Sequence, residues 1–286
     1  MQQEIIEWFE REGRDLPWRD PEFSPWGSLV SEFMLQQTPV ARVIPRLEQW
    51  LERWPTPAAL AQDSAGEAVR AWDNLGYPRR ALWLHQCAAA IVERHNGIVP
   101  SDVEELLALP GVGPYTARAV AVFAFGAHEP VVDTNVRRVI ARHNVGNADQ
   151  GPPATTRDLE DMRAIMPGPD LSPAFNAGIM ELGALVCTSR NPQCDICPIA
   201  NTCAWRNAGY PEHEGPKKVT QKKYEGSDRQ ARGAILKVLR TAHGPVGAME
   251  IAECWPDQAQ LGRAIAGLLN DGLIDVSADE MYSLPS

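Results

Sequence analysis

Four cysteines lie close together in the chain, at Cys187, Cys194, Cys197 and Cys203, with six, two and five residues between successive members. Thiolates are soft ligands, and four of them suit a tetrahedral zinc ion or an iron–sulfur cluster. Two disulfides are the alternative, but a Cys-x2-Cys pair in an intracellular protein favours metal. The spacing therefore predicts a metal centre, without separating zinc from iron–sulfur.

A glycine-rich segment follows a predicted helix, and residues 109–117 read LPGVGPYTA. Gly111 and Gly113 allow a tight hairpin, and Pro114 suits the first position of the next helix. The exposed N–H groups at that helix start form an anion site. An ordinary helix-to-helix turn would also contain Gly-x-Gly, but predicted helices over 103–109 and 116–125 complete a helix–hairpin–helix.

Two acids are candidates for chemistry. Asp133 follows an apolar run and precedes Thr134 and Asn135, so taken alone it reads as a helix cap. Glu32 lies among apolar neighbours in the run SEFMLQQT, residues 31–38. Partial burial would raise the pKa of Glu32 and keep it available as a proton donor.

Taken together, these motifs resemble the helix–hairpin–helix DNA glycosylases of the endonuclease III class, and most closely the adenine-excising MutY type. The likeness also rests on LPWR at 16–19, LGY at 75–77 and MELG at 180–183, in order over roughly residues 4 to 206. The resemblance implies that the four cysteines bind a 4Fe–4S cluster and that the hairpin clamps DNA phosphates, assisted by a monovalent cation. Thr134 and Ala177 depart from the family, which has glycine and a polar residue at these positions.

The resemblance also implies a reaction, the hydrolysis of the N-glycosidic bond of adenine mispaired with 8-oxoguanine or guanine. Glu32 would protonate the purine, and ionised Asp133 would stabilise the cationic sugar, with Tyr115 and Asn135 flanking it. Core packing is the alternative role for Trp18 and Tyr77. The residues expected to bind DNA or the extruded base are Trp18, Arg19, Gln36, Gln37, Thr38, Tyr77, Gly111, Val112 and Gly113.

The chain has no lysine before Lys217. Relatives that also cut the DNA strand use a lysine at the position of Tyr115, so we expect a monofunctional enzyme that leaves an abasic site. Tyrosine also occurs there in a relative that excises mismatched thymine, which makes a thymine or uracil mismatch glycosylase one alternative. A non-catalytic iron–sulfur DNA-binding regulator is another.

The elements that must position these residues are predicted to be mainly helical, in a two-lobed glycosylase domain over residues 1–209. A six-helix lobe, 21–132, would be inserted between residues 1–20 and 133–209, which form the iron–sulfur lobe. A basic linker over 210–227 and a small winged-helix-like α+β module over 228–286 would follow. The module is expected to contain a helix capped by Ser227 and ending at Arg240, a helix over 248–254 and a third capped by Asp257. A hairpin would pair 273–276 with 281–284. It is too short for the NUDIX-like domain that many relatives use to inspect 8-oxoguanine.

The charge and hydrophobicity of the chain limit the kinds of partner that it can bind. A net charge of −10 argues against coating nucleic acid by bulk electrostatics, and no apolar run is long enough to span a membrane. Phosphate contacts would then come from the basic segment Lys217–Arg240 and from arginines of the main domain. We expect a monomer on double-stranded DNA, in the cytoplasm and associated with the nucleoid. The arginines in question are Arg79, Arg80, Arg137, Arg138 and Arg142. The resemblance also implies that Arg138 links the cluster toward Asp133.

Overall fold

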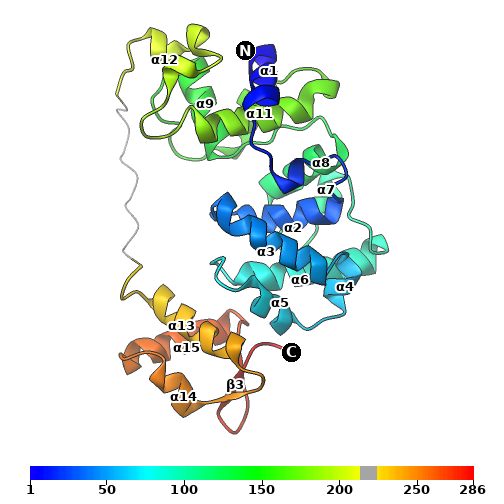
Figure 1. Cartoon of the computed structure of the whole chain (residues 1–286), viewed down its shortest axis with the longest axis vertical. Helices are drawn as coiled ribbons and strands as arrows, with labels where there is room; N and C mark the ends of the chain where they lie inside the picture. Colours follow the sequence, from blue (N-terminus) through cyan, green and yellow to red (C-terminus); the bar gives the residue numbers. More distant parts are fainter. Residues whose placement is uncertain (213–223) are drawn as a thin grey trace. The chain divides into compact units, whose positions relative to one another are not determined.

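The structure is a computed structural model that describes residues 1–212 and 224–286 (Figure 1). Much of the predicted basic linker, with four of its lysines, lies outside the described residues. The chain divides into two compact units. The first contains Met1–Ser28, Ser101–Leu107 and the described residues from Gly113 to 212, and the second contains Leu29–Pro100, Ala108–Val112 and 224–286.

The described residues of the first unit form helices joined by loops, with no strand. It holds α1 (Gln2–Glu12), η1 (Pro17–Arg19), the start of α2 (Pro25–Leu35), α7 (Val103–Leu107), α8 (Pro114–Phe125), α9 (Thr134–Ile140), η2 (Ala141–Val145), α10 (Thr155–Arg163), η3 (Pro169–Leu171), α11 (Ser172–Leu185), η4 (Cys194–Ile196), η5 (Ala200–Thr202) and α12 (Ala204–Asn207). Helix α11 lies against both α1 and α9 (Figure 1). The core between them is apolar and includes Ile5, Val136, Phe175 and Ile179, all without exposed surface.

The second unit contains α3 (Val40–Arg53), α4 (Pro57–Ala61), α5 (Ala65–Trp72) and α6 (Arg79–His95), together with most of α2. Three tryptophans form its centre. The rings of Trp50 and Trp54 lie 4.6 Å apart, and those of Trp50 and Trp72 lie 5.7 Å apart, all in edge-to-face contact. Aromatic pairs in this geometry add to the stabilisation from burial.

The helices begin and end where local chemistry requires. The predicted helix at 116–125 begins two residues earlier, at Pro114, and ends at Gly126, whose φ is 71°. Helix α6, Arg79–His95, ends at Asn96 in the left-handed conformation. Both ends follow the preference of helices for proline at the start and a left-handed residue at the end.

The C-terminal module belongs to the second unit and contains α13 (Asp228–Thr241), β1 (Val246–Gly247), α14 (Ala248–Glu253), α15 (Gln258–Asn270), β2 (Asp275–Val276) and β3 (Met281–Ser283). Ser227 and Asp257 cap α13 and α15, as predicted. The predicted hairpin forms, with Asp275 opposite Ser283. Strand β1, which the sequence did not indicate, adds to β3 and gives the order β1-β3-β2. Three helices with a small antiparallel sheet match the winged-helix-like α+β prediction.

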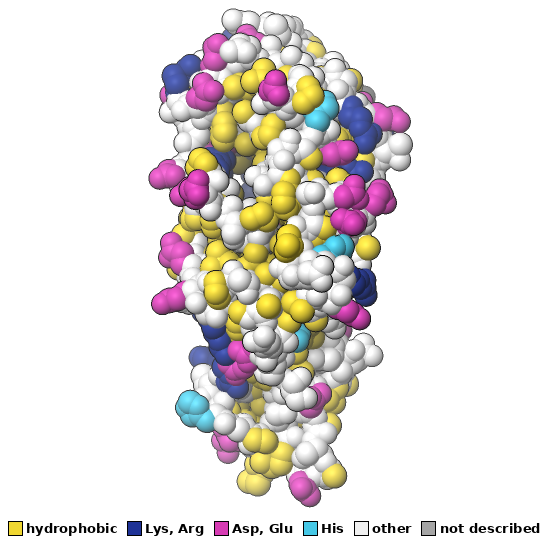
Figure 2. Space-filling model, turned by 90° about the vertical axis from the view of Figure 1, so that its right-hand side faces the viewer, with side chains coloured by type: hydrophobic (Ala, Val, Ile, Leu, Met, Phe, Trp, Pro, Cys, Tyr) yellow, Lys and Arg dark blue, Asp and Glu magenta, His cyan; other side chains and the backbone are white. Residues whose placement is uncertain are grey.

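In the part of the chain that the structure describes, none of the helices combines the length and apolarity needed to cross a membrane. On the face drawn in Figure 2, acidic side chains are scattered over the surface and outnumber the basic ones. The excess of acids on this face agrees with the chain's net charge of −10, and no broad basic patch is present there.

Candidate active site

Asp133 caps α9 and is also the candidate catalytic carboxylate for the sugar. Its Oδ1 accepts hydrogen bonds from the backbone N–H groups of Asn135 and Val136, at 2.8 and 2.7 Å. Its Oδ2 accepts a hydrogen bond from the side-chain amide of Asn135 at 2.8 Å. Burial raises the pKa of Asp133 above its ordinary value, although these bonds and the charge of Arg138 oppose the rise. One oxygen thus fixes the helix start, and the other is oriented by a single side chain.

Arg138 fixes the orientation of that side chain. Its Nη2 donates to Asn135 Oδ1 at 2.7 Å and to the Gly183 carbonyl at 2.6 Å, while its Nε donates to the Cys187 carbonyl at 2.7 Å. With its oxygen bound by Arg138, the Asn135 amide must direct its N–H group to Asp133. A continuous hydrogen-bonded path therefore connects the first cysteine of the quartet with the candidate catalytic carboxylate.

Gly183 of α11 packs directly against Asn135 of α9. A Cβ atom at this position would lie 2.7 Å from the Asn135 Cβ and 2.9 Å from its carbonyl oxygen, closer than real Cβ contacts come. The glycine of the MELG run therefore permits the packing that holds Asn135 beside Asp133. Sequence reasoning used this run as a family signature and missed its physical role.

The other predicted catalytic residues are placed within their own units. Tyr115 begins α8 and packs against Ala119, Val122 and Val131, the apolar cluster that leads into Asp133. Glu32 belongs to the second unit, where it lies on α2 with only 8% of its surface exposed. This burial agrees with the prediction made from its apolar neighbours.

Gln37 and Tyr77 are brought together by the second unit. The Tyr77 hydroxyl donates to Gln37 Oε1 at 2.7 Å, and the Tyr77 side chain is exposed. Both residues have left-handed backbones, with φ of 56° and 47°. Non-glycine residues in this region are strained by about 1–3 kcal/mol each and persist only where surrounding structure fixes them.

Arg80 provides that surrounding structure. Its guanidinium donates to the carbonyls of Phe33, Gln36 and Gly76 and to Thr38 Oγ1, at distances of 2.6 to 3.1 Å. Burial lowers the pKa of Arg80 to about 10. Arg80 thus connects the predicted DNA-binding residues Gln36 and Thr38 to the turn that carries Tyr77. The sequence analysis had assigned Arg80 to phosphate contacts.

The arginine assignments need correction more widely. Arg80, Arg137, Arg138 and Arg142 are each at most 9% exposed. Their guanidinium groups bind backbone carbonyls, because the loops that they hold would otherwise have unpaired acceptors. Of the five arginines, Arg79 alone is exposed, and it pairs with Asp271 at 3.3 Å. These side chains organise the protein rather than a phosphate-binding surface.

Arg19, predicted to line the adenine pocket, lies with Arg14 on the buried carboxylate of Glu181. Arg14 donates through Nε and Nη2 at 2.7 Å each, and Arg19 Nη2 donates at 2.9 Å. Burial favours a higher pKa for Glu181, but these bonds outweigh it and bring the pKa to about 2. Trp18, beside Arg19 in η1, is half-buried. The sequence analysis did not identify Glu181 as a site residue, because no local pattern connects it with Arg19, which lies 162 positions earlier in the chain.

The glycine-rich hairpin has two different glycines. Gly111 has a φ of 75°, and a Cβ there would collide with Trp83 and Phe33. Gly113 caps α8 with extended backbone, and a Cβ there would meet nothing within 4 Å. Val112 between them is buried. The first glycine is therefore required by the fold, and the second caps α8, where the predicted anion site would lie.

The four cysteines line one pocket with Arg142 and Trp205. Arg142 Nη1 lies 3.4 Å from Cys187 Sγ and donates to the Thr188 carbonyl, and its guanidinium stacks 4.5 Å from the Trp205 ring. Four thiols around one pocket form a soft donor set that suits a metal ion or an iron–sulfur cluster.

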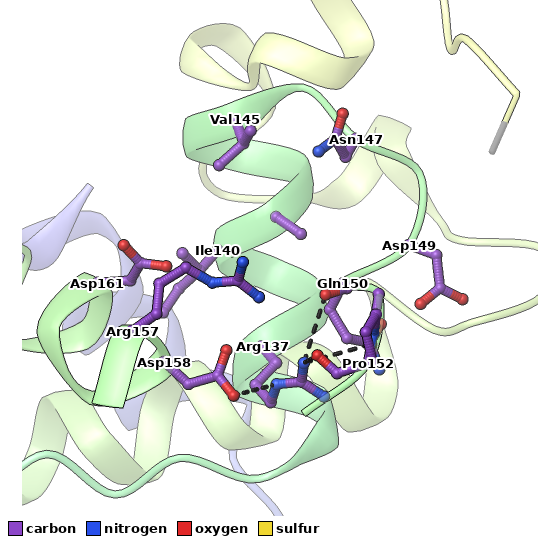
Figure 3. A pocket seen from close by; sticks show the side chains of 12 residues that line it. Arg137, Ile140, Val145, Asn147, Asp149, Gln150, Pro152, Arg157, Asp158 and Asp161 are labelled. Carbon is purple, nitrogen blue, oxygen red and sulfur yellow. Dashed lines mark hydrogen bonds and ion pairs between the residues drawn. The ribbon is translucent and has the colours of Figure 1, made fainter. Parts of the chain in front are cut away.

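A cavity of about 540 Å³ lies beside α9 and α10 (Figure 3). Arg137 crosses it, pairing with Asp158 at 2.8 Å and donating to the Pro152 carbonyl at 2.7 Å. Asp149, Asp161 and Arg157 are also among its lining residues. Of the residues that the sequence analysis named, only Arg137 lines this cavity, and no predicted catalytic residue does, so its size does not identify it as the active site.

Comparison with known proteins agrees with this geometry. Residues 30–163 match the HhH-GPD superfamily of base excision DNA repair proteins, and residues 187–203 match the iron–sulfur binding domain of endonuclease III. The cysteine pocket is accordingly that of a 4Fe–4S cluster. A structure of a thermostable thymine-DNA glycosylase is similar with a TM-score of 0.67 and 27% identity, covering 72% of this chain and 94% of that one.

Two curated relatives span different lengths of the chain. A thymine/uracil-DNA glycosylase of Pyrobaculum aerophilum is 38% identical over 201 residues, 69% of this chain and 87% of its own. An adenine DNA glycosylase of Mycobacterium tuberculosis (strain H37Rv) is 52% identical over 282 residues, which is 98% of this chain and 92% of its own. The chain therefore belongs to the adenine DNA glycosylase family within the HhH-GPD superfamily of base excision repair proteins.

Proposed function

We propose that this protein is a monofunctional DNA glycosylase that removes adenine mispaired with 8-oxoguanine or guanine. The observation that carries the proposal is the Asp133–Asn135 pair at the start of α9, in a chain 52% identical to an adenine DNA glycosylase over nearly its whole length. The N-glycosidic bond breaks with positive charge developing on the sugar and negative charge on the base. A catalyst needs one group for each charge.

The group for the sugar is Asp133. Its Oδ1 is occupied by two backbone N–H groups, so Oδ2 is the oxygen available for an oxocarbenium-like sugar or for covalent addition to it. Asn135 keeps Oδ2 in one orientation. Tyr115, at the start of α8 beside the cluster that leads to Asp133, would support the intermediate.

The group for the base is Glu32. A buried carboxyl on an apolar stretch of α2 is suited to donate a proton to N7 of adenine, which converts a poor anionic leaving group into a neutral one. General acid catalysis of this kind is worth about 10²–10⁴ in rate. After the base departs, the same carboxylate would activate the water that completes hydrolysis.

The adenine must first leave the DNA stack, at a cost of a few kcal/mol that is lowest at a mispair. The exposed Tyr77, hydrogen-bonded to Gln37 on strained and well-supported backbone, is suited to enter the duplex at the vacated position. Arg19, held by Glu181, and Trp18 would line the pocket that receives the base. The bound 4Fe–4S cluster would hold the loop of residues 187–203 and carry no step of the reaction.

Monofunctional action is proposed because residues 1–216 contain no lysine for Schiff-base formation with the sugar. A thymine or uracil mismatch glycosylase is the second candidate. Three observations favour this second candidate: the tyrosine at position 115, the absence of a polar side chain at Ala177, and the likeness to a thymine/uracil-DNA glycosylase.

One experiment separates these functions. Single-turnover base release is measured on duplexes containing A:8-oxoG, A:G, A:C, T:G and U:G, with alkali added to reveal abasic sites. The proposal expects rapid release from A:8-oxoG and A:G and intact strands before alkali. Faster release from T:G or U:G would establish the second candidate, and binding without release from any duplex would indicate a regulator.

A further inference from the structure

Within the second unit, the C-terminal module contacts α5 and α6 on either side of one short turn. Arg70, on α5, donates through Nη1 to the carbonyls of Leu239, Arg240 and Ala242 at the end of α13. In return, Arg240 Nε donates to the Val69 carbonyl at 3.0 Å. Each arginine thus binds backbone acceptors beside the other, and burial lowers the pKa of Arg240 to about 10.

Two further contacts lie on either side. The last residues of the chain pack on Gly66 of α5, where an added Cβ would collide with the Pro285 carbonyl and the Leu284 side chain. Asp271, directly after α15, pairs with Arg79 at 3.3 Å and also binds Arg232. The module therefore binds the helix before and the helix after the Asp73–Pro78 turn.

That turn presents Tyr77. Trp72, fully buried at the end of α5, donates through its indole N–H to the Gly76 carbonyl at 2.9 Å. Asp73 has a φ of 45° and pairs with Arg46 at 2.6 Å. A displacement of α5 would move Trp72, and through it the turn, because each contact is a direct hydrogen bond.

The charge of the module argues against a role on DNA. Residues 224–286 contain nine acidic and five basic side chains. Helix α15 carries one basic residue, Arg263, and the β2–β3 connection carries the exposed acids Asp279 and Glu280. Arg232 and Arg240, assigned above to phosphate contacts, bind Asp271 and the Val69 carbonyl instead. Such a surface would repel a phosphate backbone rather than neutralise it.

We propose that the C-terminal module is a positioning element that holds the Asp73–Pro78 turn, and with it Tyr77, in the conformation needed to enter the duplex at a mispair. The inference rests on the role proposed above for Tyr77. The tuberculosis relative aligns over 98% of the chain and so through this module, whereas the alignment with the thymine/uracil-DNA glycosylase covers 69%.

The test uses full-length protein and two substitutions that weaken attachment in different ways. Gly66→Ala places a methyl group against the chain end, yet alanine is the better helix former, so α5 itself is not weakened. Asp271→Asn removes the charge that pairs with Arg79. Asp279→Asn, an exposed acid of the same module, is the matched control.

Hydrogen exchange of the amides of residues 73–80 in the free protein is the first readout, and it is independent of base specificity. We expect exchange about tenfold faster in Asp271→Asn, the factor expected when one hydrogen bond to a charged group is lost. We also expect faster exchange in Gly66→Ala, whose methyl group displaces the chain end, and no change in Asp279→Asn. Unchanged exchange in both variants would overturn the proposal, whatever bases the enzyme removes.

The second readout is the preference for mispaired over matched duplex, measured with Tyr77→Ala alone and combined with Gly66→Ala. A positioning role predicts that Gly66→Ala reduces the preference in the wild-type background and has no further effect when Tyr77 is absent. Additive losses would show that the module acts elsewhere on the complex, and an unchanged preference despite faster exchange would show attachment without positioning. Either result would refute the proposal.

Discussion

The Asn135 side chain offers a direct test of how the catalytic carboxylate is controlled. The substitution Asn135→Ala removes the hydrogen bond from the side-chain amide to Asp133 Oδ2 and leaves both backbone bonds to Oδ1. Only ionised Asp133 can stabilise the cationic sugar. Because the amide bond favours the ionised form, its loss should raise a pKa that burial has already raised.

The size of the shift follows from the bond that is lost. A hydrogen bond to a charged group contributes about 1.5–3 kcal/mol, and one pKa unit corresponds to about 1.4 kcal/mol. The expected rise is therefore about one to two units. Arg138 loses its bond to Asn135 in the same variant, but its charge remains nearby and opposes the rise, so we expect about one unit.

The assay is single-turnover adenine release from an A:8-oxoG duplex between about pH 4 and pH 9. The acid limb of the profile should move to higher pH by about one unit, while rates well above it change less. Thr134→Ala, an exposed side chain between the two residues, is the control and should leave the limb unchanged. A uniform fall in rate with an unmoved limb would show that Asn135 acts on the substrate and not on Asp133.

The remaining predictions concern the acid pair, the cluster and the fold. Glu32→Gln and Asp133→Asn should each abolish adenine release while retaining binding to mispaired DNA, and near-normal single-turnover release by either variant would contradict the assigned roles. Purified protein should contain iron and sulfide, so stoichiometric zinc without iron in anaerobic preparations would refute the cluster. Glu181→Gln should lower the free energy of unfolding at neutral pH by about 3 kcal/mol, as expected for a broken buried ion pair. Because the folded pKa of Glu181 is about 2 and its ordinary value is 4.5, the wild-type advantage should shrink as pH falls from 4.5 towards 2, which denaturant unfolding at several pH values would measure.

The helices were predictable from sequence because their limits are set locally. Pro114 and Gly126 bound α8, and Ser227 and Asp257 cap the two long helices of the module. Strand β1 was not predictable, because two residues cannot show an alternating pattern and Val246 and Gly247 become a strand only by pairing with β3.

The candidate site was predictable where residue types carry the signal. The cysteine spacing indicated the metal centre, and the apolar neighbours of Glu32 indicated its burial. The roles of Arg80 and Glu181 were not predictable, because their partners are distant in sequence and meet only in the fold. The sequence of a DNA-binding chain does not distinguish an arginine that contacts phosphate from one that binds a buried backbone carbonyl.

The close packing at Gly183 has a consequence for genetics. In a mutant screen for lost repair, substitutions at this position should appear beside those at Asp133, although glycine has no side chain to take part in the reaction. Any larger residue would push Asn135 away from the carboxylate that it orients. A map of intolerant positions would then extend beyond the residues that touch the base.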